Sequence, residues 1–275
     1  MSTRDVRYCC FSKGRVLLLS LTRACNQGCL HCMRSATIGA AGAVDIAVFE
    51  KALKDAIVRV TPDRIVISGG EPTLVPNLPD VISAVSLKGY TSTICTNATL
   101  IQADAAHELA RRGVVKATVG IEGVGADYDY FRNTKSMFPR AVRGIEALLS
   151  AGIHVTINLT LWNRLIEDSR PIAFFLNTYP FESVSVTVPL VQGRARLNER
   201  VFRELNPMSV ARFVQELASL VKVPIDLRIP ECRSVTCPSG KSVHTLLFGQ
   251  RLQGCLDANA ITAFECYQGA DYAEC

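Results

Sequence analysis

The chain has 275 residues, of which 48% are hydrophobic and 20% charged, and a net charge of +5. This composition fits one large α/β domain, alone or with a small appendage, that can bury a substantial core. The charge is too weak and too dispersed to indicate nucleic-acid binding, and the apolar run 16–21 is too short for a signal peptide or a membrane span.

Apolar runs alternate with stretches of helical periodicity along most of the chain. Strands are expected at 15–21, 64–68, 91–96, 115–121, 154–161 and 183–188. Helices are expected at 45–59, 78–87, 103–112, 139–150, 168–177 and 210–221. Six β/α units with near-continuous apolar strands predict a parallel sheet, and they are too few to close an eight-stranded barrel.

The pattern changes at Pro224, beyond which helical periodicity is weak and five cysteines occur. We therefore expect a β/α domain at 1–223 and a small cysteine-rich extension at 224–275. The polar N-terminus predicts a cytoplasmic protein, in which clustered cysteines indicate metal or redox chemistry because disulfides are rare there. Eight of the eleven cysteines fall at 25–32 and 232–275, which predicts two metal sites.

The first group lies in a tight loop directly after the first strand. Cys25, Cys29 and Cys32 are spaced four and three residues apart, and thiolates suit iron–sulfur clusters or zinc. Three such ligands can hold three irons of a 4Fe–4S cube and leave the fourth iron open. A closed zinc site would require a fourth nearby ligand, and His31 is poorly placed because its neighbours are already candidate ligands. A zinc or redox cysteine cluster remains the alternative.

This loop resembles the cluster loop of the radical S-adenosylmethionine (radical SAM) superfamily, with His31 as the aromatic residue before the last cysteine. Residues 69–72 match the GGEP motif of the same family. The resemblance implies an open partial (β/α)6 barrel, similar to a TIM barrel, and a 4Fe–4S cluster that binds and reductively cleaves S-adenosylmethionine to a 5′-deoxyadenosyl radical. It also implies a flavodoxin- or ferredoxin-type electron donor. The weak charge and the short apolar run predict no nucleic-acid or membrane partner.

The resemblance assigns cofactor contacts to residues at the carboxyl ends of the strands, where ligands of such sheets bind. Glu71 would contact the methionine amino group, and Gly69 and Gly70 would let the backbone approach a ligand closely. Asn97 belongs to a Thr-Asn-Ala segment similar to the family's TNG, and it could face the cofactor or simply cap a turn. Arg132 matches the position that pairs with the methionine carboxylate.

Two residues depart from the pattern of the subgroup that carries SPASM or twitch extensions. Gly120 stands where that subgroup has a cofactor-contacting Ser, so we assign it no such role, and Glu122 replaces an Asp. Residues 189–195 resemble a P-x-x-x-G-R-A element of the same subgroup and are expected to shape the site. Residues 127–130 are expected to form a polar, aromatic loop at the catalytic face.

The C-terminal cysteines resemble a twitch-like extension that binds a second 4Fe–4S cluster. Its expected ligands are Cys237, Cys255, Cys266 and Cys275, with Cys232 as a competitor. The glycine of that pattern is displaced by one position, and zinc or simply buried thiols are the alternatives.

The expected activity is that of a radical SAM enzyme that abstracts hydrogen from a small biosynthetic metabolite, such as a sugar or aminocyclitol alcohol, and oxidises or epimerises it at carbon. One alternative is maturation of a ribosomally made peptide. An alternative of another class is a non-catalytic iron–sulfur electron carrier. The sequence does not identify a catalytic acid or base.

Overall fold

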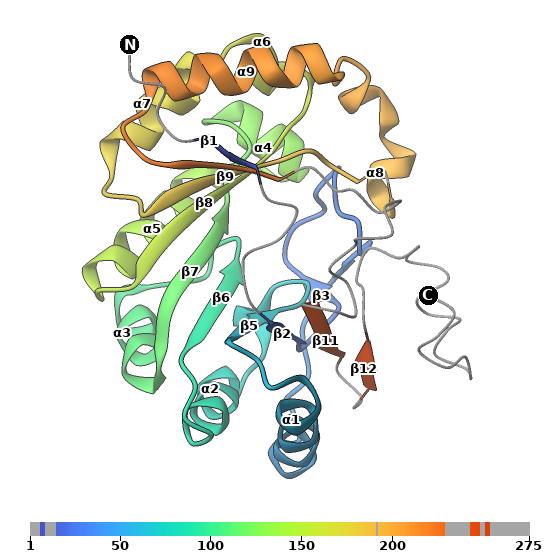
Figure 1. Ribbon diagram of the computed structural model, residues 1–275, viewed down its shortest axis with the longest axis vertical. Helices are drawn as coiled ribbons and strands as arrows, with labels where there is room; N and C mark the ends of the chain where they lie inside the picture. Colours follow the sequence, from blue (N-terminus) through green and yellow to red (C-terminus); the bar gives the residue numbers. More distant parts are fainter. Residues whose placement is uncertain (1–5, 9–14, 191, 229–242, 248–250, 254–275) are drawn as a thin grey trace.

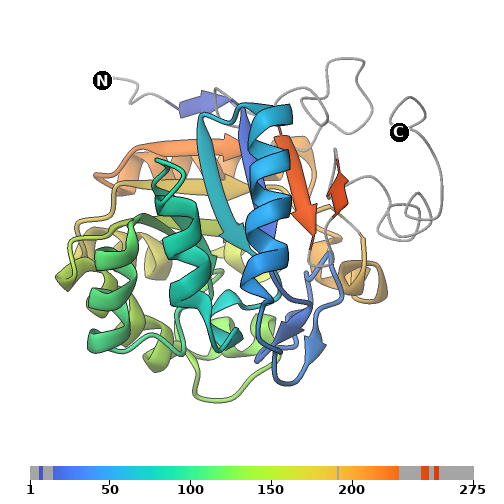
Figure 2. The same ribbon diagram turned by 90° about the horizontal axis from the view of Figure 1, so that it is seen from below.

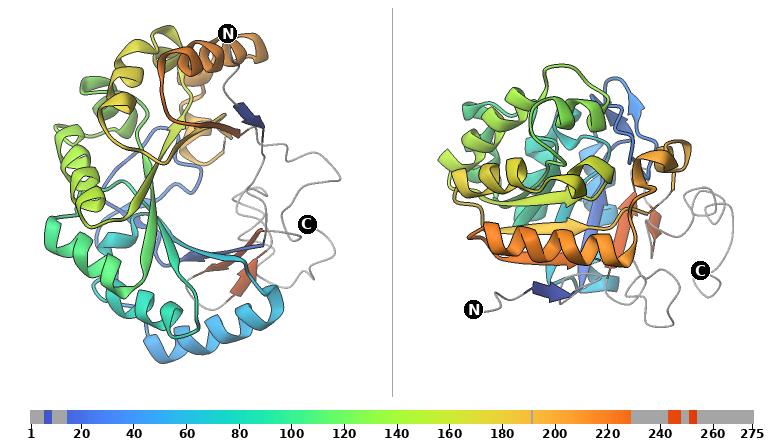
Figure 3. Two further views of the ribbon diagram at one scale, coloured as in Figure 1. Left: turned by 60° about the vertical axis from the view of Figure 1, so that its left-hand side comes forward. Right: turned by 90° about the horizontal axis from the view of Figure 1, so that it is seen from above.

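The computed structural model describes residues 6–8, 15–190, 192–228, 243–247 and 251–253. Within these ranges the chain forms one ten-stranded sheet, in the order β1-β10-β9-β8-β7-β6-β5-β2-β11-β12. Neighbouring strands run parallel except for the last pair, β11 with β12. Figure 3 shows this sheet as an open arc, which confirms the expected partial barrel.

All six expected strands are present in the middle of the sheet. They are β2 (Val16–Ser20), β5 (Arg64–Ser68), β6 (Ser92–Thr96), β7 (Val114–Gly120), β8 (His154–Thr160) and β9 (Ser183–Thr187). Their alternate residues, such as Ile65 and Ile67 on β5, are almost completely buried beneath the outer helices. Successive side chains of a strand point to opposite faces of the sheet. Each strand therefore has an apolar outer face beneath the helices and an inner face on the concave side of the arc.

The six expected helices cover the convex side of the arc (Figures 1 and 2). They are α1 (Ile46–Val60), α2 (Leu78–Ser86), α3 (Ala103–Arg112), α5 (Phe138–Ser150), α7 (Arg170–Thr178) and α9 (Pro207–Leu220). Their boundaries follow local chemistry. Asp45 caps α1 by accepting from the Val48 N–H, and Asn206 and Ser209 form a capping box at the start of α9.

Several elements were not expected from the sequence. The polar, aromatic segment becomes a short helix, α4 (Ala126–Arg132), which buries Tyr128 and Phe131. The sheet also continues past residue 224, because β10 (Ile225–Arg228) pairs in parallel with β9, and β1 (Val6–Tyr8) pairs with β10. At the other edge, β11 (Val243–Leu247) pairs with β2, and β12 (Arg251–Gln253) follows it.

The short elements lie at the carboxyl ends of the strands. A two-stranded parallel sheet joins β3 (Ala24–Cys25) to β4 (Thr37–Ile38) and so closes the segment that contains the first three cysteines. The remaining turns of helix are η1 (Pro72–Leu74), α6 (Asn163–Glu167), α8 (Arg194–Leu197) and η2 (Glu199–Phe202). In the part of the chain that the structure describes, no helix is both long and apolar enough to cross a membrane.

Candidate functional site

The loop with Cys25, Cys29 and Cys32 is fixed by residues from distant parts of the chain. The Leu30 N–H donates to the carbonyl of Phe131 in α4 (2.9 Å). The Asn97 side chain, just after β6, donates to Asn26 Oδ1 (2.7 Å). Because these contacts come from different β/α units, the shape of the cysteine loop depends on the assembled sheet.

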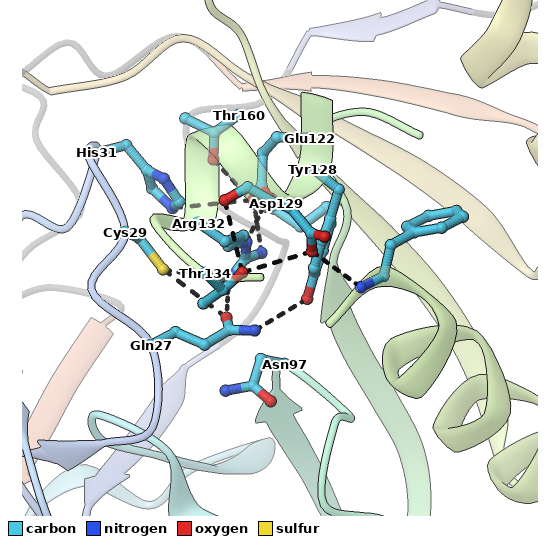
Figure 4. A network of polar contacts seen from close by, with 12 residues as sticks. Gln27, Cys29, His31, Asn97, Glu122, Tyr128, Asp129, Arg132, Thr134 and Thr160 are labelled. Atoms are coloured by element: carbon cyan, nitrogen blue, oxygen red, sulfur yellow. Dashed lines mark hydrogen bonds and ion pairs between the residues drawn. The ribbon is translucent and has the colours of Figure 1, made fainter. Parts of the chain in front are cut away.

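Each of the three sulfurs accepts an N–H hydrogen bond. Cys25 Sγ accepts from the backbone of Gln27 (3.4 Å) and Cys32 Sγ from the backbone of Ala36 (3.3 Å). Cys29 Sγ accepts from Nη1 of Arg132 (3.7 Å), as Figure 4 shows. Donors directed at sulfur are what a thiolate ligand of an iron–sulfur cluster requires, because they stabilise its negative charge.

The three thiols also lie close enough to influence one another. Burial raises the pKa of Cys29 to about 11, although the Arg132 charge opposes this effect, and Cys25 and Cys32 add to it. Burial raises the pKa of Cys25 as well, and Cys32 contributes again. The three thiols are buried or half-buried, and as thiolates they would repel one another. A cationic metal centre bound between them would relieve this repulsion.

A single zinc ion fits this arrangement less well than a cluster. Among the residues described here, no three His, Cys, Asp or Glu side chains converge on one metal position. Zinc would draw its ligands to about 2.0–2.3 Å from one ion, whereas a 4Fe–4S cube spreads three cysteines over three irons. The His31 ring stacks on Phe131 with centroids 4.6 Å apart, and its Nε2 lies 3.8 Å from Glu122 Oε1.

The Gly-Gly-Glu segment after β5 packs against the chain that leads into the cysteine loop. The Gly70 N–H donates to the Thr22 carbonyl (2.7 Å) and the Glu71 N–H to the Ala24 carbonyl (2.8 Å). A Cβ at position 70 would lie only 2.1 Å from that Ala24 oxygen. A glycine is therefore required at position 70, because two backbone segments approach each other closely there. The sequence alone does not reveal this reason.

Glu71 is almost completely buried, and its carboxylate accepts four hydrogen bonds. The donors are the Thr73 N–H (3.1 Å), the Thr73 hydroxyl (2.7 Å), the Thr96 hydroxyl (2.7 Å) and the Asn97 N–H (2.7 Å). Burial raises the pKa of Glu71, and these hydrogen bonds counteract the effect. The carboxylate thus ties the end of β5 to the end of β6.

Asn97 and Ala98 form the turn that follows β6. Asn97 Oδ1 accepts from the backbone and hydroxyl of Thr99 (3.0 and 2.6 Å), while its amide donates to Asn26. Ala98 has a positive φ of 61°, a conformation that favours the glycine of the related TNG motif. Asn97 therefore both caps a turn and holds the cysteine loop.

A bidentate ion pair joins Arg132 to Glu122 behind Cys29. Nε of Arg132 donates to Oε2 of Glu122 (2.6 Å) and Nη2 donates to Oε1 (2.8 Å). Burial alone would lower the pKa of Arg132, but Glu122 and Cys29 raise it well above its usual value. Burial and the positive charges of Arg132 and Arg194 lower the pKa of His31, whose Nε2 lies 3.8 Å from Glu122.

The expected Gly-Arg-Ala element packs directly on the cysteine loop. The Arg194 N–H donates to the Cys32 carbonyl (2.9 Å), and its side chain donates to the carbonyls of Cys29 (3.1 Å) and Ala36 (2.8 Å). A Cβ at Gly193 would lie 2.3 Å from the Met33 carbonyl oxygen. The Arg194 Nη2 atom is buried and makes no hydrogen bond within the described residues.

The comparison with protein families decides the classification. A family model described as "Radical SAM superfamily" matches residues 19–175, which span β2 to α7 and include the cysteine loop. The chain belongs to the radical SAM superfamily. That family implies a 4Fe–4S cluster and S-adenosylmethionine as cofactors, and the donor set around the three cysteines fits such a cluster.

Two similar proteins come from Methanosarcina barkeri. The chain is 33% identical over 168 residues to an Fe-coproporphyrin III synthase, covering 58% of this chain and 40% of that protein. It is 30% identical over 156 residues to an AdoMet-dependent heme synthase, covering 56% and 44%. The chain thus spans less than half the length of these two relatives.

Similar solved structures include SuiB of Streptococcus suis. The crystal structure with S-adenosylmethionine bound superposes with a TM-score of 0.72 at 14% identity, covering 88% of this chain and 60% of SuiB. The structure with the precursor peptide SuiA superposes with a TM-score of 0.73 at 14% identity, covering 93% and 61%. At this identity the likeness concerns the fold, and it supports the radical SAM partial barrel.

The structure brings together the expected residues of the first half of the chain and adds others. Glu71 accepts from Asn97, Asn97 donates to Asn26 of the cysteine loop, and Arg132 contacts Cys29, so these expected residues meet at the cysteine loop. The expected ligands of a second cluster lie outside the described residues, and so does the competing Cys232. These ligands are Cys237, Cys255, Cys266 and Cys275.

Gln27 and Tyr128 also belong to this site, although no sequence pattern assigned them a role. Gln27 Oε1 accepts from Arg132 Nη1 (3.3 Å), and its amide donates to the Tyr128 hydroxyl (3.1 Å). Tyr128 is completely buried, and its ring lies beneath the Arg132 guanidinium at 5.4 Å. Tyr128 falls in the polar, aromatic run 127–130, so only its position near the catalytic face could be expected.

Proposed function

We propose that Cys25, Cys29 and Cys32 hold the 4Fe–4S cluster of a radical SAM enzyme. The observation that carries this proposal is that each of the three sulfurs already accepts an N–H, from Gln27, Arg132 and Ala36. When bound and reduced, the cluster supplies the electron that cleaves the sulfonium of S-adenosylmethionine and releases a 5′-deoxyadenosyl radical. A flavodoxin- or ferredoxin-type protein in a reducing cytoplasm is the proposed electron donor.

The residues of the chain position and shield these reactants. Glu71 and Asn97 hold the ends of β5 and β6 against the cysteine loop. We propose that this edge, with Gly69 and Gly70, receives the methionine group of the cofactor. Arg132 is also a candidate for this task by its position in the family pattern.

The inner face of the sheet supports a polar small molecule as substrate. Residues such as Ile157 and Val186 face the buried outer core, so the alternate positions line the concave side. Those positions carry hydroxyl and amide groups. The Thr156 and Ser183 hydroxyls lie 3.1 Å apart, and the Thr187 hydroxyl donates to Asn158 (2.9 Å). Such a wall suits a polyhydroxylated metabolite that is oxidised or epimerised at carbon.

Peptide maturation is the second candidate, because the SuiB fold that resembles this chain has been crystallised with a precursor peptide. The two candidates differ in what would bind. A sugar or aminocyclitol that increases formation of 5′-deoxyadenosine supports the first, and a peptide that does so supports the second. An electron carrier would form no 5′-deoxyadenosine with either.

The decisive experiment is anaerobic reconstitution, followed by iron and sulfide analysis and by measurement of 5′-deoxyadenosine after reductant and S-adenosylmethionine are added. We expect cleavage by the wild-type chain, and loss of cleavage and of about four irons in Cys29→Ala. Cys95→Ala, which removes a thiol on β6 outside the loop, is the matched control. Full iron content and cleavage in Cys29→Ala would exclude the proposed site.

The same experiment tests the proposed auxiliary cluster. Cys237, Cys255, Cys266 and Cys275 are its proposed ligands, and such a cluster could exchange electrons with a substrate radical. About eight irons per chain would support it, and Cys255→Ala should then retain about four. Iron content in Cys255→Ala equal to that of the wild type would reject the auxiliary cluster and leave the radical enzyme intact.

A further inference from the structure

Arg132 uses all three of its guanidinium nitrogens on protein groups. Nε and Nη2 hold the two oxygens of Glu122 at 2.6 and 2.8 Å, and Nη1 points to Cys29 Sγ at 3.7 Å (Figure 4). The fork that would receive a carboxylate of the cofactor is therefore occupied by a carboxylate of the chain itself. A bidentate pair of this kind is geometrically specific and strong.

The surroundings keep this side chain in place. A Cβ at Gly120 would lie only 2.0 Å from Arg132 Nη2, so the absence of a side chain on β7 makes room for the guanidinium. Tyr128 packs beneath it at 5.4 Å, and Gln27 accepts from Nη1 at 3.3 Å. Gly120 leaves room for the guanidinium and Glu122 pairs with it, so both departures from the family pattern position Arg132.

This arrangement directs a positive charge at a cluster ligand. The Arg132 guanidinium lies between the Cys29 sulfur and the Glu122 carboxylate, because Nη1 contacts Sγ while Nε and Nη2 hold the two carboxylate oxygens. The ion pair therefore acts as a dipole with its positive end at the Cys29 sulfur. Cations and N–H donors at ligand sulfurs favour the reduced, more negative state of a cluster.

We propose that Arg132 is a fixed cation that raises the reduction potential of the cluster through Cys29, and that Glu122 and Gly120 are positioning residues for it. This proposal rests on the proposed function, because it needs a cluster on Cys29. It assigns recognition of the methionine carboxylate to other residues. The expectation that Arg132 binds that carboxylate is the competing hypothesis.

Two variants test the role of Arg132 without leaving a buried charge unpaired. Arg132→Lys keeps the charge but lacks the fork that reaches both Glu122 and Cys29. The double variant Glu122→Gln with Arg132→Gln removes both charges together. Arg170→Gln is the matched control, because Arg170 also pairs through two nitrogens with an acid, Asp168, but is exposed at the surface.

Two quantities are measured. The first is the midpoint potential of the reconstituted cluster, monitored by electron paramagnetic resonance, and the second is the dissociation constant of S-adenosylmethionine. We expect a lower midpoint potential in both Arg132 variants, a dissociation constant within about threefold of the wild type, and no change in Arg170→Gln. An unchanged midpoint potential overturns the proposal. A dissociation constant raised tenfold or more at unchanged potential would instead assign the methionine carboxylate to Arg132.

Two further outcomes are distinguishable. If both Arg132 variants fail to load iron while Arg170→Gln loads normally, Arg132 serves to fold the loop and the proposal fails. If the wild-type chain itself holds no cluster or forms no 5′-deoxyadenosine, the proposed function fails first. An intact wild-type cluster with unchanged variant potentials rejects only the role of Arg132.

Discussion

Gly144 of α5 lies directly against the carbonyl oxygen of Ala98, at the turn after β6. A Cβ at Gly144 would stand 1.9 Å from that oxygen. Gly144→Ala should therefore lower the free energy of unfolding by about 1–3 kcal/mol, because neither backbone can move without disturbing the other. Gly42→Ala is the control, since a Cβ there meets nothing within 4 Å. Urea unfolding under anaerobic conditions measures both, and equal stabilities would show that α5 can shift freely.

Arg194 should control how firmly the cysteine loop holds its cluster. Arg194→Met removes the hydrogen bonds to the carbonyls of Cys29 and Ala36 at similar side-chain length. We expect iron to be released to a chelator about fivefold faster or more, since one lost hydrogen bond is worth about 1 kcal/mol. The exposed neighbour Arg196 provides the control variant Arg196→Met. Equal release rates in the two variants would contradict a clamping role.

Glu71 should affect both stability and cofactor affinity. The Thr73 hydroxyl donates to Oε1 of Glu71 and the Asn97 N–H donates to Oε2, so in Glu71→Gln the single amide nitrogen would face one of these donors in either orientation. We expect a loss of about 1–3 kcal/mol in stability and about tenfold weaker binding of S-adenosylmethionine. Calorimetric titration gives the affinity, and Asp55→Asn on the exposed side of α1 should change neither quantity. Unchanged affinity would show that Glu71 does not contribute to binding of S-adenosylmethionine.

Tyr128 should make the protein sensitive to alkali. Burial raises the pKa of Tyr128 to about 12, although Arg132 and the hydrogen bond from Gln27 oppose this, while an unfolded tyrosine ionises near pH 10. Tyr128 therefore loses its proton at a lower pH in the unfolded state than in the folded state. As pH rises from 10 towards 12, the free energy of unfolding falls. The full contribution of Tyr128 is present below pH 10.

The variant Tyr128→Phe isolates this effect. At pH 7 it should be less stable by about 1 kcal/mol, because it lacks the hydrogen bond from Gln27. Above pH 10 the difference from the wild type should shrink, since phenylalanine does not ionise. Urea unfolding between pH 8 and 11 measures this, and a constant difference over that range would place the Tyr128 pKa near its usual value.

The sheet and its outer helices could be predicted because their signals are local. Apolar runs such as 64–68 form strands, and helical periodicity with a cap such as Asp45 forms helices. The four-residue strand β10 gave too short a pattern to stand out after Pro224. The helix α4 was expected to be a loop, because its charged residues hid that Tyr128 and Phe131 pack inward.

The candidate site was predictable only as a set of motifs. The cysteines, Glu71 and Arg132 could be named from spacing and resemblance. The contact of Arg132 with Gln27 could not, because 105 residues separate the two in sequence. The reason for Gly120 likewise appears only when the guanidinium lies over β7. Packing across distant elements therefore carries the information that the motifs lack.

The tethering of the cysteine loop has a consequence for biogenesis. The backbone of the loop is held by Phe131 and Arg194, which follow it in the sequence and are therefore synthesised later. A nascent chain that presents only the three cysteines would lack the partners that shape their loop. If these cysteines hold the proposed cluster, its insertion would require the segments with Phe131 and Arg194 to have been synthesised and packed on the loop.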